Sequence, residues 1–291
     1  MAKILVVIVT YNALKWVKKC LNSVEKSTLP ADVLVIDNGS TDGTLPLIRT
    51  DYPRTRIIET GENLGFGAAN NRGLRIAHDE CYDFVYLMNQ DAWLQKDTLE
   101  KLVAAHKPEW GILSPMQLNA HGRRDKQFKK KCGKLVDAAL KGYHNDTLVV
   151  EVPFVMAAHW LVSREAIATV GGFSPAFTQY GEDDNWIDRL HFHKLHCGVV
   201  PAASAVHDRG GRKLPYEKKM ELKCIATVVK VSDPNRNWRR VRIREVLELV
   251  GMGLKNFSAI PWRYIKVLKA RFPELKELRD ASMERGAFLL K

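Results

Sequence analysis

The chain has 291 residues, 46% of them hydrophobic and 27% charged, a composition that fits a globular protein with one large domain and a substantial appendage. It has no run of about 18 uncharged apolar residues, which excludes a membrane-spanning helix, and its first residues lead into a strand pattern rather than a signal peptide. Five scattered cysteines without a CxxC pair argue against a zinc site or a disulfide framework, so we expect reduced thiols in a cytoplasmic protein.

The net charge of +12 lies entirely in the C-terminal part of the chain. Residues 1–208 contain 24 Lys and Arg and 24 Asp and Glu, whereas residues 209–291 contain 21 and 9. We therefore expect a boundary near residue 210. It separates a domain over residues 1–210 that carries the chemistry from a helical, basic extension over residues 211–291 that meets an anionic partner.

Strand and helix patterns alternate over the first 115 residues. Residues 3–10 form a nearly continuous apolar run, as in a strand buried on both faces, and residues 14–27 have apolar positions at helical spacing. The same reasoning predicts strands at 33–36, 56–59 and 84–88 and helices at 44–50 and 67–78. This alternation predicts an α/β fold with a mostly parallel sheet flanked by helices.

Residues 116–210 are less regular. A run rich in Lys and Arg predicts an exposed loop over residues 119–134, and the apolar residues 152–163 lead into a helix at 164–170. A second helix is expected at 185–196, followed by a short edge strand from residue 199 to residue 207.

Polar residues directly follow three of the predicted strands. Ligands of parallel α/β sheets bind beyond the carboxyl ends of the strands, so these residues are candidates for a binding site. They are Thr10, Tyr11, Asn12, Asp37, Asn89, Gln90 and Asp91.

Five segments, taken in order, resemble the successive motifs of family 2 glycosyltransferases with the GT-A fold, especially the bacterial rhamnosyltransferase-like branch. They are residues 6–12, 35–44, 63–73, 87–91 and 171–189. The resemblance covers roughly residues 3–211, with a nucleotide-sugar half over about 1–115 and an acceptor half over about 116–210. It implies metal-dependent, inverting transfer of a sugar from a UDP- or dTDP-sugar to a hydroxyl of a saccharide or lipid-linked saccharide, in the synthesis of surface polysaccharide.

Asp37 is the candidate for recognition of the nucleotide base, because a carboxylate at a strand end can accept the N3–H of uracil or thymine. Tyr11 offers an aromatic face to the same ring, with Thr10 and Asn12 beside it. The alternative is that Asp37 only shapes a tight turn, which is the role we favour for Asp42.

The loop before residue 70 contains Gly65-x-Gly67-x-x-Asn70, which nearly matches a dinucleotide-binding fingerprint and raises the alternative of a nicotinamide-dependent oxidoreductase. However, its third position is Asn and it follows the third strand rather than the first. The glycosyltransferase resemblance instead implies that Asn63 and Gly67 lie near the nucleotide-sugar. A helix start that needs glycine for geometry alone is the other reading.

Asn89-Gln90-Asp91 stands where the family has its DxD metal motif. Asn89 departs from that motif, so the resemblance implies Asp91 as the single carboxylate that binds Mg²⁺ or Mn²⁺, with Asn89 at the nucleotide. His207 stands where relatives place a histidine that reaches the metal or the diphosphate. The alternative for Asn89-Gln90-Asp91 is a polar strand end that caps the next helix, and the alternative for His207 is a histidine with a structural role.

Glu182, Asp183 and Asp184 look like the acidic motif that supplies the family's catalytic base, which here falls on Asp183. Repulsion among three adjacent acids favours a raised pKa for one of them, and Glu182 and Asp184 then lie on the acceptor side. An acidic helix N-terminus is the alternative. Trp160 is expected either to stack on an acceptor sugar or to lie in the core.

The basic extension mixes aromatic, aliphatic and cationic residues at 238–244 and 260–269. Such segments suit helices in an anionic lipid interface, which would place the protein at the inner face of the plasma membrane beside a lipid-linked acceptor. The alternative is a set of helices packed on the domain with a solvated basic face. The extension has no recognisable nucleic-acid module, so no nucleic acid is expected, and a non-catalytic membrane or nucleic-acid binder remains the rival to an enzyme.

Overall fold

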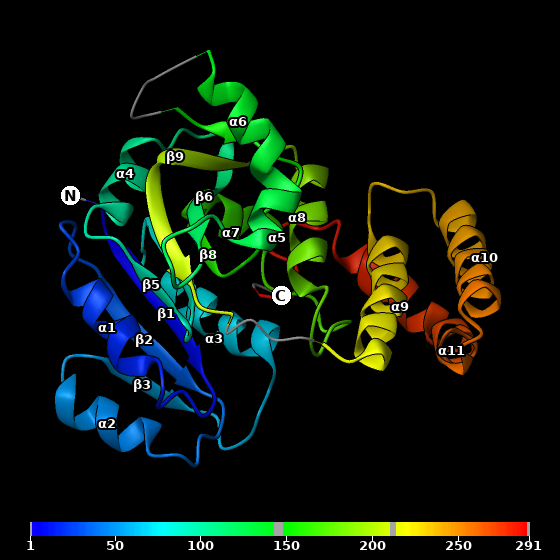
Figure 1. Cartoon of the computed structure of the whole chain (residues 1–291), viewed down its shortest axis with the longest axis horizontal. Helices are drawn as coiled ribbons and strands as arrows, with labels where there is room; N and C mark the ends of the chain where they lie inside the picture. The colour runs from blue at the N-terminus through cyan, green and yellow to red at the C-terminus, as the bar shows by residue number, and fades with distance from the viewer. Residues whose placement is uncertain (1, 143–147, 210–213, 290–291) are drawn as a thin grey trace.

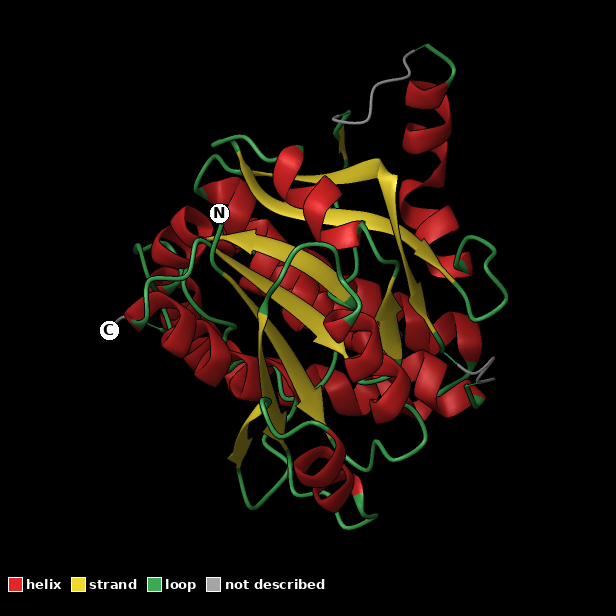
Figure 2. Ribbon diagram, turned by 90° about the vertical axis from the view of Figure 1, so that its left-hand side faces the viewer, coloured by secondary structure: helices red, strands yellow, loops and turns green. Residues whose placement is uncertain are grey.

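A computed structural model describes residues 2–142, 148–209 and 214–289 of the chain. One nine-stranded sheet with helices on both faces forms the body, and three long helices stand beside it (Figure 1). Figure 2 shows the strands in the middle of the molecule between two groups of helices. Over the described residues, no helix combines the length and the hydropathy needed to cross a bilayer.

The first half of the sheet is parallel and centres on β1 (Ile4–Thr10). This strand pairs with β2 (Asp32–Asp37) on one side and with β4 (Phe84–Asn89) on the other, and β2 pairs with β3 (Arg56–Glu59). Alternate residues of β1 belong to different apolar clusters: Leu5 and Val7 pack with α3, whereas Val6 and Ile8 pack with α1 and α2. The predicted strand buried on both faces is therefore confirmed.

The helices of this half are α1 (Val17–Glu25), α2 (Thr44–Asp51), α3 (Phe66–Asp79) and α4 (Thr98–Ala104). The predicted helices at 44–50 and 67–78 are confirmed to within a residue or so. The helix predicted at 14–27 exists but begins later, at Val17.

The second half of the sheet mixes strand directions. Strand β8 (His159–Ser163) lies antiparallel between β4 and β6 (Trp110–Leu118), and β9 (His196–His207) runs parallel to β6. Two short strands, β5 (Ala92–Leu94) and β7 (Val150–Glu151), pair antiparallel with β9. The same direction is shared by β1, β2, β3, β4, β6 and β9, so the predicted mostly parallel sheet is confirmed.

Three predictions for this half are wrong. The short edge strand is the twelve-residue β9, which lies inside the sheet and buries apolar residues on both faces. The exposed loop becomes helical from Lys126 onward, as α5 (Lys126–Phe128), a π-helical turn (Lys129–Gly133) and α6 (Lys134–Leu140). The helix expected at 185–196 is α8 (Glu182–Phe192), so the three acids form its first turn instead of preceding it.

The helix predicted at 164–170 is α7 (Arg164–Val170), with the hydroxyl of Ser163 accepting a hydrogen bond from the amide of Ala166 at 3.2 Å. The predicted boundary near residue 210 lies outside the described residues. Beyond it come α9 (Tyr216–Ser232), α10 (Trp238–Asn256) and α11 (Ala259–Ala281).

The three C-terminal helices pack on each other and on the body. They share an apolar cluster that includes Met220, Leu249 and Leu268, and this cluster also takes in Ala176 and Phe177 from the body. The extension is therefore packed against the domain that carries the sheet, as one of the two readings of its sequence expected.

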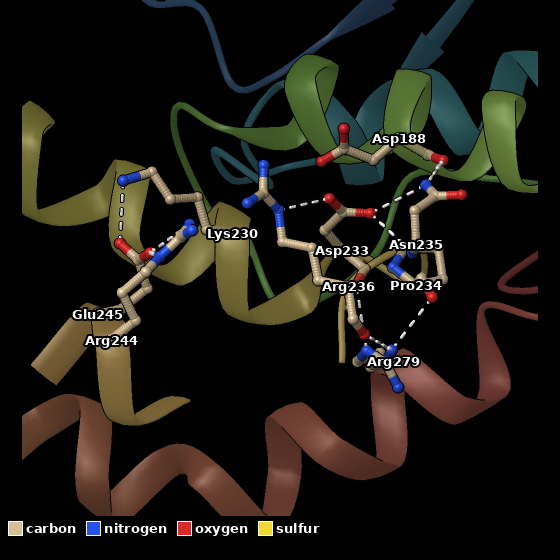
Figure 3. A network of polar contacts seen from close by, with 9 residues as sticks. All are labelled: Asp188, Lys230, Asp233, Pro234, Asn235, Arg236, Arg244, Glu245 and Arg279. Atoms are coloured by element: carbon tan, nitrogen blue, oxygen red, sulfur yellow. Dashed lines mark hydrogen bonds and ion pairs between the residues drawn. The ribbon is translucent and has the colours of Figure 1, made fainter. Parts of the chain in front are cut away.

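A polar network holds the turn between α9 and α10 (Figure 3). The buried guanidinium of Arg279 on α11 donates to the carbonyls of Asp233 (3.1 Å), Pro234 (3.1 Å) and Arg236 (2.6 Å). On the other side of the turn, the side-chain amide of Asn235 donates to the carbonyl of Asp188 on α8 at 2.7 Å. This turn, residues 233–236, thus joins α11 to the helix that begins with the three acids.

The end of the chain also returns to the body. The amide of Gly172 donates to the carbonyl of Ala287 at 2.8 Å, and the amide of Gly286 donates to that of Thr169 at 3.0 Å. Gly171 has φ 82°, and an added Cβ would lie 2.0 Å from the carbonyl oxygen of Ala287. The extension is therefore anchored at both the 233–236 turn and its C-terminal end.

Arg279→Met should lower the free energy of unfolding by about 2 kcal/mol, because it leaves the carbonyls of Pro234 and Arg236 without this donor and the carbonyl of Asp233 with only the amide of Arg236. Arg285→Met is the matched control, since Arg285 is exposed and its ion pair with Glu165 should contribute less than about 1 kcal/mol. Urea unfolding of the full chain measures both. Equal effects in the two variants would contradict a stabilising role for the network.

Candidate active site

The sequence-predicted polar residues meet at one edge of the sheet. The parallel strands β1, β2, β4 and β9 all end at this edge, with Thr10, Asp37, Asn89 and His207 as their last residues. Strand β8 runs the opposite way and begins there, at His159. The edge therefore gathers residues that are up to about two hundred positions apart in the chain, as expected for a site beyond the carboxyl ends of strands.

Asp37 is buried, and its carboxylate holds the ends of β1 and β2 together. Its Oδ1 accepts hydrogen bonds from the hydroxyls of Thr10 (2.8 Å) and Ser40 (2.5 Å), and its Oδ2 accepts one from the amide of Ser40 (2.8 Å). The structure thus displays the turn-shaping role that was the alternative for Asp37. Asp42 has the expected turn role, since it accepts from the amides of Thr44 and Leu14.

The loop after β1 is fixed from two sides. Asn12, in the left-handed region at φ 51°, donates its amide to Ser40 at 2.9 Å and accepts from the amide of Thr41 at 2.8 Å. The side chain of Gln90 brackets Tyr11, accepting from its amide at 2.7 Å and donating to its carbonyl at 3.2 Å. The ring of Tyr11 is 47% exposed and so remains available for stacking.

The loop after β3 contains two residues predicted to lie near the nucleotide-sugar, Asn63 and Gly67, and their surroundings differ. Asn63 is exposed, and its Oδ1 accepts from the amide of Gly65 at 2.9 Å and from the side chain of Asn38 at 3.4 Å. Gly67 is buried, and an added Cβ would lie 2.9 Å from the Cβ of Phe173. The absent side chain of Gly67 makes room for Phe173, in line with the reading in which this glycine is needed for geometry, and its position near the nucleotide-sugar stays a prediction.

Asp91 and His207 form a pair at the far end of this edge. The carboxylate Oδ1 of Asp91 lies 3.3 Å from Nε2 of His207, and both side chains are largely buried. Ala92 pairs with His207 across β5 and β9, which explains why residues so distant in sequence are adjacent. The Nδ1 of His207 is buried and has no hydrogen-bond partner among the described residues.

A linking segment, residues 157–159, joins this pair to the acidic motif. The amide of Ala157 donates to the carboxylate of Asp183, and the carbonyl of Ala158 accepts from the amide of Asn89 at 3.3 Å. The buried ring of His159 lies between the hydroxyl of Tyr86 (2.9 Å) and the carbonyl of Val206 (3.0 Å). One short segment thus contacts the acidic motif and the ends of the strands that carry Asp91 and His207.

The three acids of α8 have raised pKa values. Burial, reinforced by the charge of Asp183, raises the pKa of Glu182 to about 7 and that of Asp184 to about 7. Burial also raises the pKa of Asp183, although the amides of Asp184 and Ala157 oppose it by stabilising its ionised form. The cluster is therefore poised to exchange protons near neutral pH.

These acids border a cavity of about 420 Å³ that the extension completes. On the body side it is lined by Asp183, Asp184, Asp188, Lys131 and Arg209. The opposite wall comes from the extension, with the apolar side chains of Leu222, Ile225, Ala226 and Val229 on α9 and, beside them, the cations Lys230 and Arg236. Gly181 allows this close approach, since an added Cβ would lie 2.7 Å from a methyl group of Val229. The pocket therefore combines acids and cations at the body with apolar and cationic side chains at the extension.

The family of proteins described as glycosyl transferase family 2 matches residues 5–171, more than half of the chain. The chain belongs to this family. The edge that gathers the nucleotide candidates, the Asp91–His207 pair and the acids is therefore the candidate active site of a glycosyltransferase.

Known glycosyltransferases resemble the chain over most of its length. An N-acetylglucosaminyl-diphospho-decaprenol L-rhamnosyltransferase of Mycobacterium tuberculosis is 28% identical over 272 residues, covering 83% of this chain and 88% of that protein. The crystal structure of Staphylococcus aureus TarS 1–349 with UDP has a TM-score of 0.56 at 16% identity and covers 97% of this chain and 88% of that one. The mannosyltransferase PcManGT of Pyrobaculum calidifontis, in complex with GDP-Man and Mn²⁺, has a TM-score of 0.56 at 20% identity, with coverage of 96% and 73%. These likenesses show the GT-A fold.

The family match excludes both alternatives to a glycosyltransferase: an oxidoreductase with the Gly65 loop at its cofactor, and a non-catalytic binding protein. The fold agrees on the first point, because the loop follows β3 at the sheet edge and its Gly67 packs against Phe173. The chain is thus an enzyme of this family, and its candidate active-site residues are the polar residues of the sheet edge outside the Gly65 loop.

Trp160 is not an acceptor-side residue of this glycosyltransferase. Its ring is fully buried in β8, stacks on Phe173 at a centroid distance of 6.3 Å and lies 5.8 Å from the ring of Trp186. The indole N–H donates to the carbonyl of Val155 at 3.1 Å, so its polar atom is also satisfied inside the protein. An aromatic core formed around Phe173 explains why this tryptophan cannot reach a sugar.

The donor set of Asp91 and His207 fits a divalent cation that is shared with a diphosphate. Nε2 of His207 and Oδ1 of Asp91 lie 3.3 Å apart, so both can bind one cation when the proton of His207 is on Nδ1. Among the described residues no three acidic, histidine or cysteine side chains form a complete metal cage. A two-ligand site is what Mg²⁺ uses when substrate phosphates supply the remaining oxygens.

Gln90, one of the polar residues that follow the predicted strands, fixes the Tyr11 loop. Sequence reasoning missed two residues of this site: Lys131 reaches the acidic pocket from the π-helical turn, and Asp188 lines the same pocket one helical turn after Asp184. A signal existed only for Asp188, because positions four residues apart share a helix face. Nothing in the sequence separates Lys131 from its basic neighbours.

Proposed function

We propose that this family 2 glycosyltransferase transfers a sugar from a UDP- or dTDP-sugar to a hydroxyl of a lipid-linked saccharide, with inversion and with the aid of Mg²⁺ or Mn²⁺. The observation that carries the proposal is the position of Asp183. It lines the pocket between the body and the extension and is joined by the linking segment to the ends of β4 and β9, beside Asp91 and His207. The protein would act on the cytoplasmic side, at the inner face of the plasma membrane.

The donor would bind across the ends of β1, β2 and β4. Tyr11 offers an exposed ring for stacking on the base, and Oδ2 of Asp37, which accepts a single hydrogen bond, retains an acceptor position for the base N3–H. Asn12 and Asn63 hold the two loops beside the base, and Asn89 lies next to the diphosphate. A preference for UDP or dTDP is supported by TarS, whose structures contain UDP and UDP-GlcNAc.

Asp183 would act as the general base. Its carboxylate takes the proton from the acceptor hydroxyl while the hydroxyl oxygen attacks the anomeric carbon from the face opposite the diphosphate, which inverts that carbon. Burial raises the pKa of this carboxylate, which makes it a stronger proton acceptor than an exposed aspartate. A bound divalent cation would neutralise the charge that develops on the departing diphosphate.

The pocket suits an acceptor with both polar and apolar parts. Glu182 and Asp184 lie beside Asp183, where a sugar would present its hydroxyls, and Lys131 and Arg209 offer cations to an anionic group of the acceptor. The apolar α9 wall faces them. The rhamnosyltransferase relative is named for a diphospho-decaprenol acceptor, which combines these three chemistries.

Asp183→Asn should reduce turnover by roughly 10²- to 10⁴-fold, since the amide cannot take up the hydroxyl proton. Binding of the nucleotide should stay within a factor of about two, because the base and diphosphate sites lie on other strands. Single-turnover kinetics and calorimetry with UDP and dTDP measure the two effects. Turnover within tenfold of the parent protein would remove Asp183 from the mechanism.

Asp91→Asn should abolish the part of nucleotide affinity that depends on Mn²⁺, because the cation loses its only carboxylate ligand. Asp97→Asn is the matched control, as Asp97 is a partly exposed acid at the start of α4 that pairs with Lys101. Thermal-shift titrations with UDP, dTDP, GDP and CMP, each with and without Mn²⁺, give the measurement. An unchanged effect of Mn²⁺ in Asp91→Asn would exclude Asp91 as a ligand.

Lys131→Met should move the acid limb of the profile of kcat/KM against pH to higher pH. The base works only when ionised, and burial already places the pKa of Asp183 above its ordinary value, so activity is lost as pH falls through that raised pKa. The charge of Lys131 lowers the pKa of Asp184, with which Asp183 titrates, so its removal raises the limb by a fraction of a unit. Lys130→Met, an exposed neighbour that does not line the pocket, should leave the limb in place. A limb that moves equally in both variants, or in neither, would contradict this assignment.

A further inference from the structure

Helix α10 is apolar on two opposite faces. Its buried positions are Val241, Glu245, Leu249 and Gly253, which face α9 and α11. A second set of large apolar side chains points into solvent, and we call it the α10 stripe. It consists of Ile243 (59% exposed), Leu247 (64%), Leu254 (63%) and, just beyond the helix, Phe257 (98%).

Helical geometry places the stripe directly opposite the packing face. Ile243 and Leu247 follow Val241 and Glu245 by two residues, which is a rotation of roughly 200° at about 3.6 residues per turn. Ile243 and Leu254 are separated by three turns, so the stripe extends about 17 Å along the helix before Phe257. An exposed apolar strip of this kind marks a binding surface.

The stripe is held in place by the packing of α10 on α11. An added Cβ on Gly253 would lie 2.6 Å from the indole nitrogen of Trp262, so the two helices touch closely near their connecting corner. At that corner Phe257 has φ 48°, and the amide of Ser258 donates to the carbonyl of Gly253 at 3.3 Å. The corner therefore presents Phe257 outward instead of folding it onto the helices.

Cations surround the stripe. Arg239, Arg240, Arg242 and Lys255 are exposed on α10. Of the two acids of this helix, Glu245 is buried and paired with Lys230 and Arg244, which leaves only Glu248 exposed. The surface thus combines an apolar strip with a net positive border.

We propose that the α10 stripe inserts into the headgroup region of an anionic phospholipid bilayer. Apolar side chains bordered by Arg and Lys are the combination that binds a helix in such an interface, where lipid phosphates meet the cations and acyl chains meet the strip. A second copy of the chain would oppose like charges across the contact, and nucleic acid would leave the apolar side chains exposed. The inference rests on the proposed function in one respect: a lipid-linked acceptor gives this attachment its purpose.

The proposed membrane contact is centred on α10, whereas the sequence indicated the two segments 238–244 and 260–269. Trp238 packs on Phe272 with ring centroids 6.0 Å apart, and Ile260, Ile265 and Leu268 lie inside the cluster shared by the three helices. These aromatic and aliphatic residues therefore build the extension. Of the four stripe residues, Leu247, Leu254 and Phe257 lie between the two predicted segments and Ile243 lies in the first.

The test is sedimentation of the full chain with vesicles of phosphatidylglycerol and phosphatidylcholine at low salt. The parent protein should bind, and Leu247→Glu with Phe257→Glu should lower the partition coefficient at least roughly tenfold, since two charged groups enter the apolar strip. Leu135→Glu is the matched control, because Leu135 is a 44% exposed leucine on α6, and it should bind as the parent does. Pure phosphatidylcholine or high salt should also release the parent protein.

Three results would overturn the proposal: no binding of the parent protein to the anionic vesicles, equal binding by the parent protein and the double variant, or equal loss in Leu135→Glu. Ultracentrifugation adds a fourth, since a dimer that the double variant dissociates would assign the stripe to a second copy. Transfer to a saccharide acceptor without its lipid should be the same in the parent protein and the double variant. Its absence in both, with vesicle binding intact, would count against the proposed function and leave the membrane contact standing.

Discussion

The buried imidazole of His159 is the contact on which the site depends. Burial lowers its pKa to about 3, so the ring is neutral and can both donate and accept. The arrangement in which Nε2–H donates to Val206 and Nδ1 accepts from Tyr86 satisfies both nitrogens and joins β4, β8 and β9 at the edge where the site forms. Because Val206 precedes His207, this contact also sets the position of the Asp91–His207 pair. A charged ring at this place would repel the cation that the pair is suited to bind.

The linking segment, residues 157–159, explains how one edge of the sheet comes to contact the acidic motif of α8. Strand β8 runs against its neighbours, so its first residues, rather than its last, lie at the edge where β4 and β9 end. Ala157 and Ala158 precede this strand and contact the acidic motif on one side and Asn89 on the other. The reversal of one strand thus lets a single segment contact both Asp183 on α8 and the end of β4, two residues before Asp91. Backbone hydrogen bonds at both contacts favour a rigid arrangement of these candidate residues.

The fold was predictable from sequence where the signal is local, and not where it depends on distant partners. Long apolar runs predict β1 and β4, and the polar residues after them predict the site edge. By contrast, β9 contains several alanines and a proline, which are poor strand formers, and its interior position comes from pairing with β6 and β5. The sequence left Trp160 with two readings, on a sugar or in the core, and gave no sign that Gly67 packs on Phe173, because Phe173 lies about a hundred residues away from Gly67. Side-chain packing across such separations leaves no trace in the local pattern.

The C-terminal extension also shows that the local sequence pattern does not predict which residues pack together. Its charge and its mixture of aromatic and aliphatic residues fit a membrane surface and a packed helical bundle equally well, since both need amphipathic helices. The structure divides these residues by their neighbours: Leu249 and Leu268 hold the three helices together, while Leu247 and Leu254 have no such contact. The anchoring of the extension to α8 and to the end of α7 then ties its orientation to the pocket wall that α9 supplies. Attachment through α10 would therefore fix the catalytic pocket relative to the lipid surface, whereas a flexible basic tail would only raise the local concentration of enzyme there.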